Sequence, residues 1–443
     1  MHRKFPVIKL LPILIAALLI SCDNLQLDFS KTATGEGAEP QNLRPRVNLK
    51  SQMNKPTVVM ISIDGFRADY LDRFKPPTLL SWAKNGIRAN GLVPSFPTLT
   101  FPNHISLITG LRPGNHGIVG NKFYDEKRQQ FYSMGDNRSV NDGSWYRGVP
   151  LWTAAEKQGM LSATCFWVGS EAKIGGIHPS YMKPYDGRVS NDQRVKWVTE
   201  WLTMPEHSRP HFISLYFSDV DSVGHKFGAH APETKKAVLA IDATLSELKR
   251  FIELNKLDVQ IVVVSDHGMK SIEKTVDLSS VVNSSLKGFQ SSGRGATVSF
   301  YSEDSAAIEN AYQDLQKVPG DFTVYRGNEL PQRWKLNDKE RRGDIVVVGK
   351  PGVYIGFQEG FATQQNVGSS NLATHGWDTA ETTELNGLFI ASGSRFKNAL
   401  RVGAIDNVHV YPLVMDILGL KVTGPIDGDL AVLKPALRYR KNQ

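Results

Sequence analysis

The segment Thr57-Val58-Val59-Met60-Ile61-Ser62-Ile63-Asp64-Gly65 decides the fold of this chain. Its first part is almost wholly apolar and rich in β-branched residues, which is typical of a strand buried on both faces of a parallel sheet. The apolar pattern stops at Asp64-Gly65, where an acidic residue and a turn residue follow. The sequence therefore predicts a central strand over 57–63 with a polar loop at its carboxyl end.

Similar apolar runs recur farther along the chain, at 212–217, 260–265 and 387–391, with helical patterns between them. The clearest helix is expected over 232–255, where apolar residues recur every three or four positions after a proline. Buried strands alternating with helices predict an α/β fold, with a doubly wound, mostly parallel central sheet and helices on both faces. We expect the folded domain over 55–430.

A stretch at about 272–371 breaks this rhythm with Gly- and Ser-rich turns and short strands such as 344–348. It is interpreted as a small inserted cap. After the domain, residues 431–443 are expected to form a basic tail.

The amino terminus has the pattern of a secretory signal. A positive start precedes a short apolar run over 10–20, which ends in Leu19-Ile20-Ser21-Cys22. This ending is similar to a bacterial lipobox, so residues 1–22 are predicted to be a lipoprotein-type signal peptide and Cys22 the lipidated residue that anchors the exported protein to the membrane of the bacterial envelope. An ordinary signal peptide cleaved nearby is the alternative. Polar residues 23–54 are predicted to form a flexible tether.

The chain has 443 residues, of which 41% are hydrophobic and 22% are charged, so a disordered or collagen-like protein is excluded. The formal charge of +8 arises largely at the two ends, and the body has no stripe of Lys and Arg interleaved with aromatics. A polynucleotide-binding groove is therefore not expected. Cys22 and Cys165 are the only cysteines, so lipidation of Cys22 leaves Cys165 as a buried free thiol without a disulfide.

Side chains that bind metals gather at the predicted carboxyl ends of the strands. They are Asp64, Asp221 and His225 in a D-x-x-x-H pattern, the adjacent Asp266 and His267, and His375 in an H-G pair. Two divalent ions about 4 Å apart need such mixed carboxylate and imidazole ligands, with a coordination position left open. Each pattern alone is common in proteins without a metal, and their joint placement is what favours a metal site. His104 is expected to order its loop instead of binding metal.

Hydroxyl groups precede a proline-started helix in P-S-F-P-T-L-T-F-P-N-H, residues 94–104. A hydroxyl near helix N–H groups and a divalent cation can act as a nucleophile, because both favour its deprotonation. Thr100 is the closest to the helix start. On spacing alone Ser95 and Thr98 remain alternatives.

Several motifs in order resemble the nucleotide pyrophosphatase/phosphodiesterase family of the alkaline phosphatase superfamily, in a bacterial single-domain form. The matching motifs are SIDGFR from residue 62, TFPNH from 100, HGIVGN from 116, FWVGSE from 166, YDGRV from 185, DSVGH from 221, SDHGM from 265, RGDIV from 342 and THGWD from 374. Their order and spacing over most of the chain after the tether make the resemblance specific.

The resemblance implies an alkaline-phosphatase-like fold and a site that binds two Zn²⁺. Asp221, His225 and His375 would hold one ion, and Asp64, Asp266, His267 and the Thr100 oxygen the other. Thr100 would form a covalent threonyl intermediate while phosphodiester or pyrophosphate bonds in nucleotides are hydrolysed to nucleoside 5′-monophosphates. Asn121 would donate a hydrogen bond to a phosphoryl oxygen. Phe101, Trp167 and Tyr185 are at positions similar to nucleoside-stacking aromatics, although Trp167 and Phe101 are equally plausible core residues.

The sequence departs from the family pattern in two respects. Leu99 stands where relatives carry a basic residue between the motif threonines, and we expect no counterpart of the additional domains of animal relatives. Competing hypotheses therefore stay open. They are a choline or glycerol phosphodiesterase with a cation–π cage, a phosphate monoester or phosphonate hydrolase, and an inactive surface lipoprotein that only binds.

Overall fold

The computed structural model describes residues 46–357 and 372–438. The predicted signal peptide, Cys22, the tether up to residue 45 and the end of the basic tail lie outside the described residues. Within the described ranges, no helix combines the length and apolar character needed to cross a membrane.

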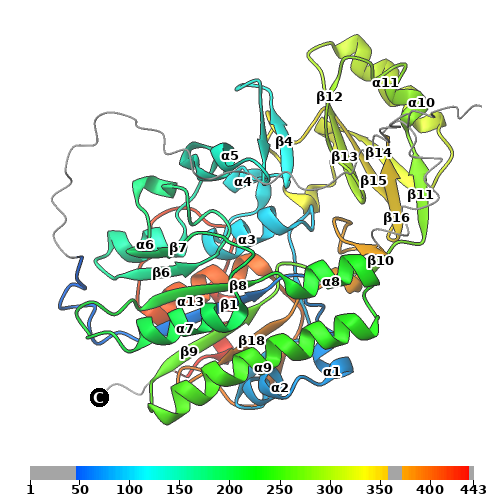
Figure 1. Ribbon diagram of the computed structural model, residues 1–443. Coiled ribbons are helices and arrows are strands. Elements are labelled where there is room, and N and C mark those ends of the chain that lie inside the picture. Colours follow the sequence, from blue (N-terminus) through cyan, green and yellow to red (C-terminus); the bar gives the residue numbers. More distant parts are fainter. Residues whose placement is uncertain (1–45, 358–371, 439–443) are drawn as a thin grey trace, which may run out of the picture. The chain divides into compact units, whose positions relative to one another are not determined.

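An eight-stranded sheet forms the centre of the described part, in the order β19-β2-β18-β9-β1-β8-β6-β7 (Figure 1). Its strands are β1 (Thr57–Ile63), β2 (Gly86–Ala89), β6 (Ser162–Cys165), β7 (Tyr181–Lys183), β8 (Phe212–Phe217), β9 (Val259–Val264), β18 (Phe389–Ser392) and β19 (Leu400–Val402). β1 pairs in parallel with both β8 and β9, so the predicted central strand is confirmed. β18 runs antiparallel to β9 and β2, which makes the sheet mostly parallel.

Alternate residues of β1 enter two different cores, because successive side chains of a strand point to opposite faces. Val58 and Met60 pack with the helices of one face, and Val59, Ile61 and Ile63 with those of the other. The first face is covered by α3 (Thr100–Thr109), α6 (Leu151–Lys157) and α13 (Val410–Leu418). The second is covered by α1 (Tyr70–Phe74), α2 (Pro77–Lys84), α7 (Asn191–Leu202) and α9 (Pro232–Leu254).

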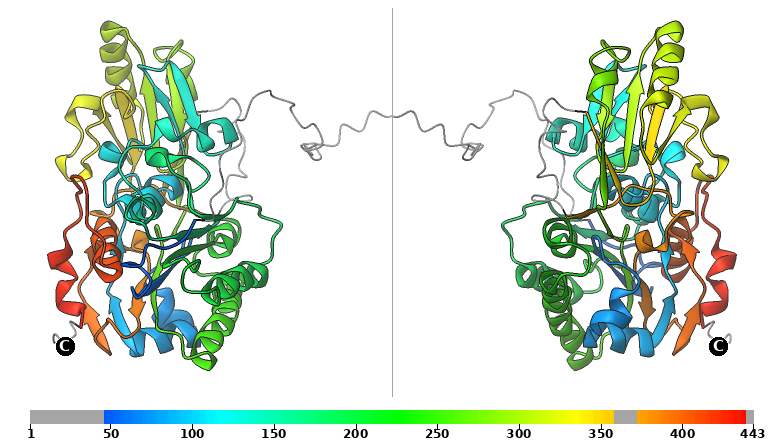
Figure 2. Two further views of the ribbon diagram at one scale, coloured as in Figure 1. Left: turned by 90° about the vertical axis from the view of Figure 1, so that its left-hand side faces the viewer. Right: turned by 90° about the vertical axis from the view of Figure 1, so that its right-hand side faces the viewer.

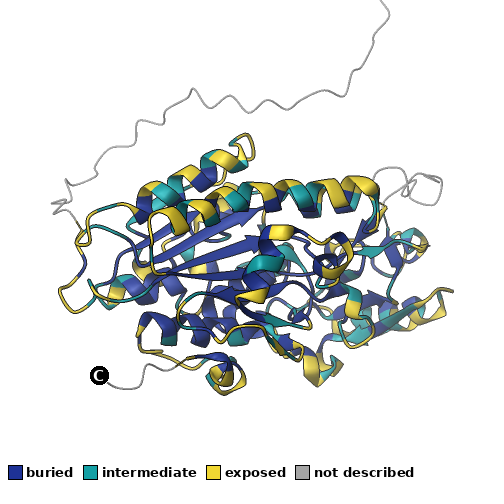
Figure 3. Cartoon of the chain, turned by 90° about the horizontal axis from the view of Figure 1, so that it is seen from below, coloured by how far each residue is buried: buried dark blue, intermediate teal, exposed yellow. Residues whose placement is uncertain are grey.

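The doubly wound arrangement is visible in Figure 2, where helices flank the sheet on both sides. In Figure 3 the strands are dark blue and the outward faces of the helices are yellow, as expected for buried strands under amphipathic helices. Cys165 on β6 is a buried free thiol, as predicted, and burial raises its pKa to about 12.

Residues of the predicted cap form a separate four-stranded sheet in the order β12-β13-β15-β14. Its antiparallel strands are β12 (Gln290–Gly293), β13 (Thr297–Tyr301), β14 (Phe322–Arg326) and β15 (Ile345–Gly349). The helices α10 (Ser279–Val282) and α11 (Ser305–Lys317) and the parallel pair β11 (Lys274–Asp277) and β16 (Val353–Gly356) complete it. This sheet has its own hydrophobic core, which includes Val298, Phe300, Leu315 and Val347.

Short elements connect these layers. They are β3 (Leu92–Val93), β20 (Ile405–Asp406), α4 (Pro113–His116), α5 (Asn137–Asn141), α8 (Asp219–Phe227), the hairpin β4 (Lys122–Asp125) and β5 (Gln130–Ser133), and the pair β10 (Lys270–Ser271) and β17 (Ala373–Thr374).

The packed body is longer than the predicted domain at both ends. Asn48, assigned to the tether from sequence, is buried; its N–H donates to His207 O and its side chain to Glu206 O. In the predicted basic tail, Leu433 and Leu437 are buried. Isolated buried residues among polar ones attach both segments to the body. They are too few to produce a periodic apolar pattern, so the sequence did not predict this attachment.

Candidate metal centre and active site

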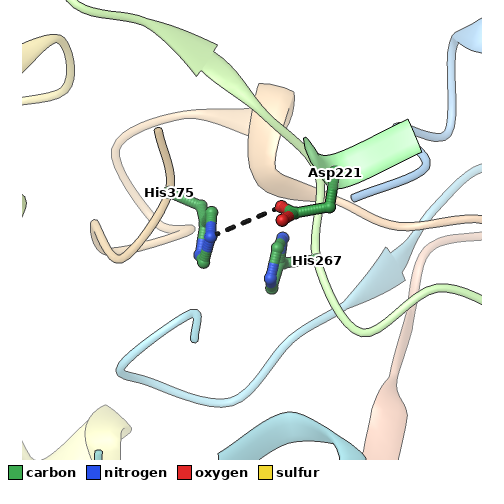
Figure 4. A group of neighbouring side chains, drawn as sticks. All are labelled: Asp221, His267 and His375. Carbon is green, nitrogen blue, oxygen red and sulfur yellow. Dashed lines mark ion pairs between the residues drawn. The ribbon is translucent and has the colours of Figure 1, made fainter. Parts of the chain in front are cut away.

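Four segments bring acidic and imidazole side chains together at the carboxyl edge of the central sheet. Asp64 follows β1, Asp266 follows β9, and Asp221 lies in the first turn of α8, which follows β8. The predicted ligands that meet there are Asp64, Asp221, His225, Asp266, His267 and His375. In Figure 4, Asp221, His267 and His375 point toward one another, and the dashed line marks 3.6 Å from Asp221 Oδ1 to His375 Nε2.

The imidazoles of His225, His267 and His375 share one tautomer. Each Nδ1 lies 2.8 or 2.9 Å from a backbone carbonyl oxygen: His225 with Ala373, His375 with Thr98, and His267 with Gly268. A carbonyl oxygen only accepts, so each Nδ1 carries the hydrogen and each Nε2 presents its lone pair to the site. Fixing the tautomer in this way is how proteins prepare histidine for a metal.

The contacts between these groups fit a cation. Nε2 of His225 and Nε2 of His375 are 3.2 Å apart, and two lone pairs at that distance repel each other. Asp64 Oδ1, Asp221 Oδ1 and Asp266 Oδ2 are buried and accept no hydrogen bond within the part of the chain described. Buried charges need a partner, and carboxylate with imidazole donors suit zinc or another divalent ion.

Grouping the donor atoms by distance gives two clusters that differ from the predicted ligand sets. Asp221, His267 and His375 form one, and Asp64, His104 and Asp266 form the other. We favour His267 over His104 as a ligand. His104 is saturated, since its Nδ1 lies 2.9 Å from Thr100 O and its Nε2 2.8 Å from Ser62 Oγ. His267 Nε2 lies 3.0 Å from Asp266 Oδ2 and 3.4 Å from Asp64 Oδ1, so it reaches both clusters.

The electrostatics of the site are those of closely spaced carboxyl and imidazole groups. Burial, with the charges of Asp266 and Asp221 alongside, raises the pKa of Asp64 well above its usual range. Burial opposes ionisation of Asp266 as well, but the imidazoles of His267 and His104 hold its pKa well below the ordinary value. Burial, with His267 and His225 alongside, lowers the pKa of His375, so its ring stays neutral and able to coordinate.

Thr100 is the hydroxyl that faces this centre. It is the first residue of α3, and its Oγ1 lies 3.3 Å from His267 Nε2. The alternatives are occupied elsewhere: Ser95 Oγ donates to Asn407 Oδ1, and Thr98 Oγ1 donates to Trp377 O and accepts from Gly376 N. Both are buried. Thr98 instead helps to position His375.

Asn121 lies beside the first turn of α3. Its Oδ1 accepts a hydrogen bond from Phe101 N at 2.9 Å. This bond fixes the orientation of the amide, because only its oxygen can accept. The Nδ2 hydrogens are therefore available as donors.

The three candidate aromatics have different environments. Tyr185 is 54% exposed and Phe101 is half-buried. Trp167 is 2% exposed and packs its ring edge-on against His104 in the core. Trp167 thus has the environment of the core alternative, whereas Phe101 is partly and Tyr185 largely accessible to a ligand.

Sequence reasoning missed the groups that hold the ligands in place. Tyr216 on β8 donates from its Oη to Asp64 Oδ2 at 2.6 Å, and burial beside that carboxylate raises the pKa of Tyr216, so it remains a donor. Ser265 Oγ accepts from Phe66 N and donates to His267 O. Tyr216 lies near the end of one apolar run and Ser265 at the end of another. The only sequence signal for their role is a polar group in an otherwise apolar stretch.

Acidic and imidazole ligands at the edge of a doubly wound sheet, beside a hydroxyl at a helix start, define a hydrolase that acts on phosphate esters. Comparison with known proteins gives the family. Residues 58–378 match the family model described as Type I phosphodiesterase / nucleotide pyrophosphatase. The chain belongs to this family of nucleotide pyrophosphatase/phosphodiesterases, in the alkaline phosphatase superfamily.

Two relatives match along most of their length. An uncharacterized pyrophosphatase/phosphodiesterase of Schizosaccharomyces pombe is 31% identical over 401 residues, covering 87% of this chain and 81% of that protein. A bis(5′-adenosyl)-triphosphatase of Xenopus laevis is 32% identical over 388 residues, covering 86% and 81%. The chain spans only 43% of the mouse ectonucleotide pyrophosphatase/phosphodiesterase family member 1.

Among solved structures, human ectonucleotide pyrophosphatase/phosphodiesterase 5 superimposes with a TM-score of 0.80 at 26% identity, covering 86% of this chain and all of that one. An inactive threonine-to-alanine form of the murine protein 5, in complex with AMP, also gives 0.80, at 27% identity and 87% coverage of this chain. The predicted α/β fold class is therefore confirmed.

Proposed function

We propose that this chain hydrolyses phosphodiester or pyrophosphate bonds in nucleotides and releases nucleoside 5′-monophosphates, with Thr100 as nucleophile. The observation that carries the proposal is the Thr100 hydroxyl 3.3 Å from an imidazole nitrogen whose lone pair faces the site. The inactive threonine-to-alanine relative that binds AMP and the bis(5′-adenosyl)-triphosphatase relative support the nucleotide assignment.

Two Zn²⁺ are the proposed cofactors. Asp221, His225 and His375 would hold one ion, and Asp64, Asp266, His267 and Thr100 the other. When bound, they would supply charge stabilisation and favour deprotonation of the attacking hydroxyl and water.

The reaction has two displacements at one phosphorus atom. Thr100 Oγ1 attacks the phosphorus, and the bond from phosphorus to the leaving oxygen breaks with its electron pair on that oxygen. A water molecule then attacks the same phosphorus, the bond to Thr100 breaks, and the hydroxyl regains a proton. Asn121 Nδ2 would donate to a non-bridging oxygen, where negative charge develops. The uncharged amide suits the single charge of a diester.

The nucleoside is proposed to stack on Phe101 and Tyr185, the half-buried and exposed rings of the candidate set. Such stacking contributes about 1–3 kcal/mol per base and tolerates different bases. Trp167 is not a proposed contact of the nucleoside, because its ring is buried against His104.

A substrate panel on the purified protein, with and without chelator, tests the function. We expect the p-nitrophenyl ester of thymidine 5′-monophosphate to be hydrolysed faster than p-nitrophenyl phosphocholine or p-nitrophenyl phosphate, and activity to be lost with chelator. Faster hydrolysis of the phosphocholine ester would instead indicate a choline phosphodiesterase. Faster hydrolysis of the monoester would indicate a phosphate monoester hydrolase.

Thr100→Ala should lower kcat on the order of 10³-fold or more and retain the bound metal, because it removes the nucleophile and leaves the other ligands. Thr203→Ala, an exposed threonine at the end of α7, is the matched control. If the native protein contains no zinc and Thr100→Ala leaves its activity unchanged, the proposed mechanism is wrong. A native protein with neither zinc nor activity would be a binding protein instead.

Export with a lipid anchor on Cys22 is the proposed location, supported by the signal pattern of residues 1–22. Expressed in a bacterium, the native chain should incorporate a labelled fatty acid and sediment with membranes. Cys22→Ser should do neither. A native chain that is released without label would support an ordinary signal peptide.

A further inference from the structure

A buried arginine of the cap contacts the segment that joins α4 to β4. Arg341 lies shortly before β15, and its side chain is only 3% exposed. Its Nε donates to Asp125 Oδ2 at 2.7 Å, and its Nη1 donates to Gly117 O and to Trp145 O, both at 2.8 Å. The guanidinium carbon lies 5.5 Å from the centre of the Phe123 ring. The planar, charged group thus fixes several partners at once.

Two of these contacts bracket Asn121 in the sequence. Gly117 directly follows α4, and Asp125 is the last residue of β4. Asn121 lies in the middle of segment 117–125. The bond from Phe101 N to Asn121 Oδ1 fixes the direction of the amide, whereas the position of its backbone depends on where the ends of the segment are held. One guanidinium holds both ends.

Gly117 has the backbone conformation and the free space that this contact requires. Its φ is 86°, in the left-handed region that favours glycine. A Cβ atom at this position would lie 2.6 Å from Arg341 Nη1, so any side chain would displace the guanidinium. The contact also joins two motifs from the sequence that the mechanism leaves without a role. Gly117 belongs to HGIVGN, and Arg341 directly precedes RGDIV.

The backbone of Arg341 is attached to the cap sheet. Tyr301 on β13 is buried, and its Oη donates to Arg341 O at 3.0 Å. The guanidinium therefore connects the cap sheet to segment 117–125. A buried ion pair adds little net stability compared with apolar packing of similar volume. Its more specific effect is on the geometry of the groups that it holds.

We infer that Arg341 is a positioning residue for Asn121, and that the cap thereby takes part in the reaction. This inference rests on the proposed function, in which Asn121 Nδ2 donates to a non-bridging phosphoryl oxygen. Arg341 acts through the backbone of segment 117–125 and not by contact with the substrate. It keeps the amide where negative charge develops, and a displacement of such a donor by about 1 Å can cost on the order of 10²-fold in rate.

A double-mutant cycle between Arg341 and Asn121 tests this inference. Arg341→Lys keeps a positive charge beside Asp125 but loses the fork that reaches both ends of the segment. The kcat and KM for the p-nitrophenyl ester of thymidine 5′-monophosphate are measured in the native protein, Arg341→Lys, Asn121→Ala and the double variant. Arg333→Lys is the matched control, because Arg333 is another cap arginine, with its Nε bonded to Asp378 Oδ2.

In Arg341→Lys, we expect kcat to fall roughly 10- to 100-fold with little change in KM, because the donor acts mainly in the transition state. In the Asn121→Ala background, the same substitution should lower kcat by no more than about twofold, since the group that it positions is already absent. Bound zinc should be retained in every variant. Arg333→Lys should have the native kcat.

A native kcat in Arg341→Lys would overturn the inference. An equal loss with and without the Asn121 amide would also overturn it, because general damage to the structure lowers both backgrounds alike. If a melting curve shows that Arg341→Lys does not fold, Asp125→Asn replaces it. This variant weakens the bond at one end of the segment, and its smaller loss of kcat should likewise disappear in the Asn121→Ala background.

Failure of the proposed function gives different results. The native protein would then not cleave the aryl nucleotide ester, or Asn121→Ala alone would have the native kcat. Neither result depends on a variant of Arg341, so the two failures are distinguishable in one set of measurements.

Discussion

Asp64 shows how single residues are prepared for their role in this site. Its Oδ2 accepts from Tyr216 Oη at 2.6 Å, and its buried Oδ1 is left without a donor in the described part of the chain. One oxygen is thus fixed by the protein, and the other is free for a metal. Partners of this kind set the orientation of a ligand and its affinity for the ion.

Tyr216→Phe should lower zinc affinity about 10- to 100-fold, because Asp64 loses the group that orients it. The ring still fills its place in the core, so the fold should be unchanged. Competition with a chelating dye measures the affinity. Tyr181→Phe, which removes a hydroxyl that donates to Ser208 O away from the site, is the control. Equal zinc affinity in Tyr216→Phe and the native protein would show that Asp64 needs no such partner.

At the scale of elements, the β4–β5 hairpin meets the cap through carboxylates. Glu126, in the turn after β4, interacts with Asp344, the residue before β15. Burial together with the charge of Asp344 raises the pKa of Glu126 from 4.5 to about 7. Between pH 4.5 and about 7, the folded protein therefore keeps a proton on Glu126 that the unfolded chain has lost.

This difference predicts a dependence of stability on pH. The stabilising contribution of the protonated Glu126 carboxyl is fully present below pH 4.5. It is lost as the pH rises through about 7, because the carboxyl must then ionise beside Asp344 in the folded state. Glu126→Gln cannot ionise. The melting temperature of the variant relative to the native protein should accordingly increase between pH 5 and pH 8, as measured by calorimetry. A difference that is the same at both pH values would contradict the coupling; Glu247→Gln on α9 serves as control.

The elements that were predicted best from the sequence are those with a regular burial pattern. β1, β8, β9 and α9 were predicted to within one or two residues, because a strand buried on both faces and an amphipathic helix each have a local pattern. The antiparallel direction of β18 was not predicted, since direction depends on the path of the chain between strands. That the candidate ligands lie close together could be predicted, because most of them follow strand ends. The roles of Tyr216 and Ser265 could not, because both contact the loop that follows β1, which is far from them in the sequence.

At the scale of the whole molecule, a metal bound at the candidate centre would connect segments from Asp64 to His375 and should stabilise the fold. Without a cation, facing imidazole lone pairs and unpartnered carboxylate oxygens oppose folding. A ligand that binds only the folded state at a hundred times its Kd contributes about 2.7 kcal/mol. Chelation should therefore lower the melting temperature, and added zinc should restore it. A melting temperature that is insensitive to both would contradict a metal shared by these segments.

The central position of β1 has a consequence for how the protein is made. Its neighbours β8 and β9 follow it by roughly 150 and 200 residues, so this apolar strand leaves the ribosome long before either partner exists. At synthesis rates of about 5–20 residues per second, the interval before β8 is made is roughly 8–30 s. During this time the apolar segment TVVMISI is exposed and can pair with the edge strand of another chain. The nascent chain should consequently depend on a holding chaperone until β8 emerges.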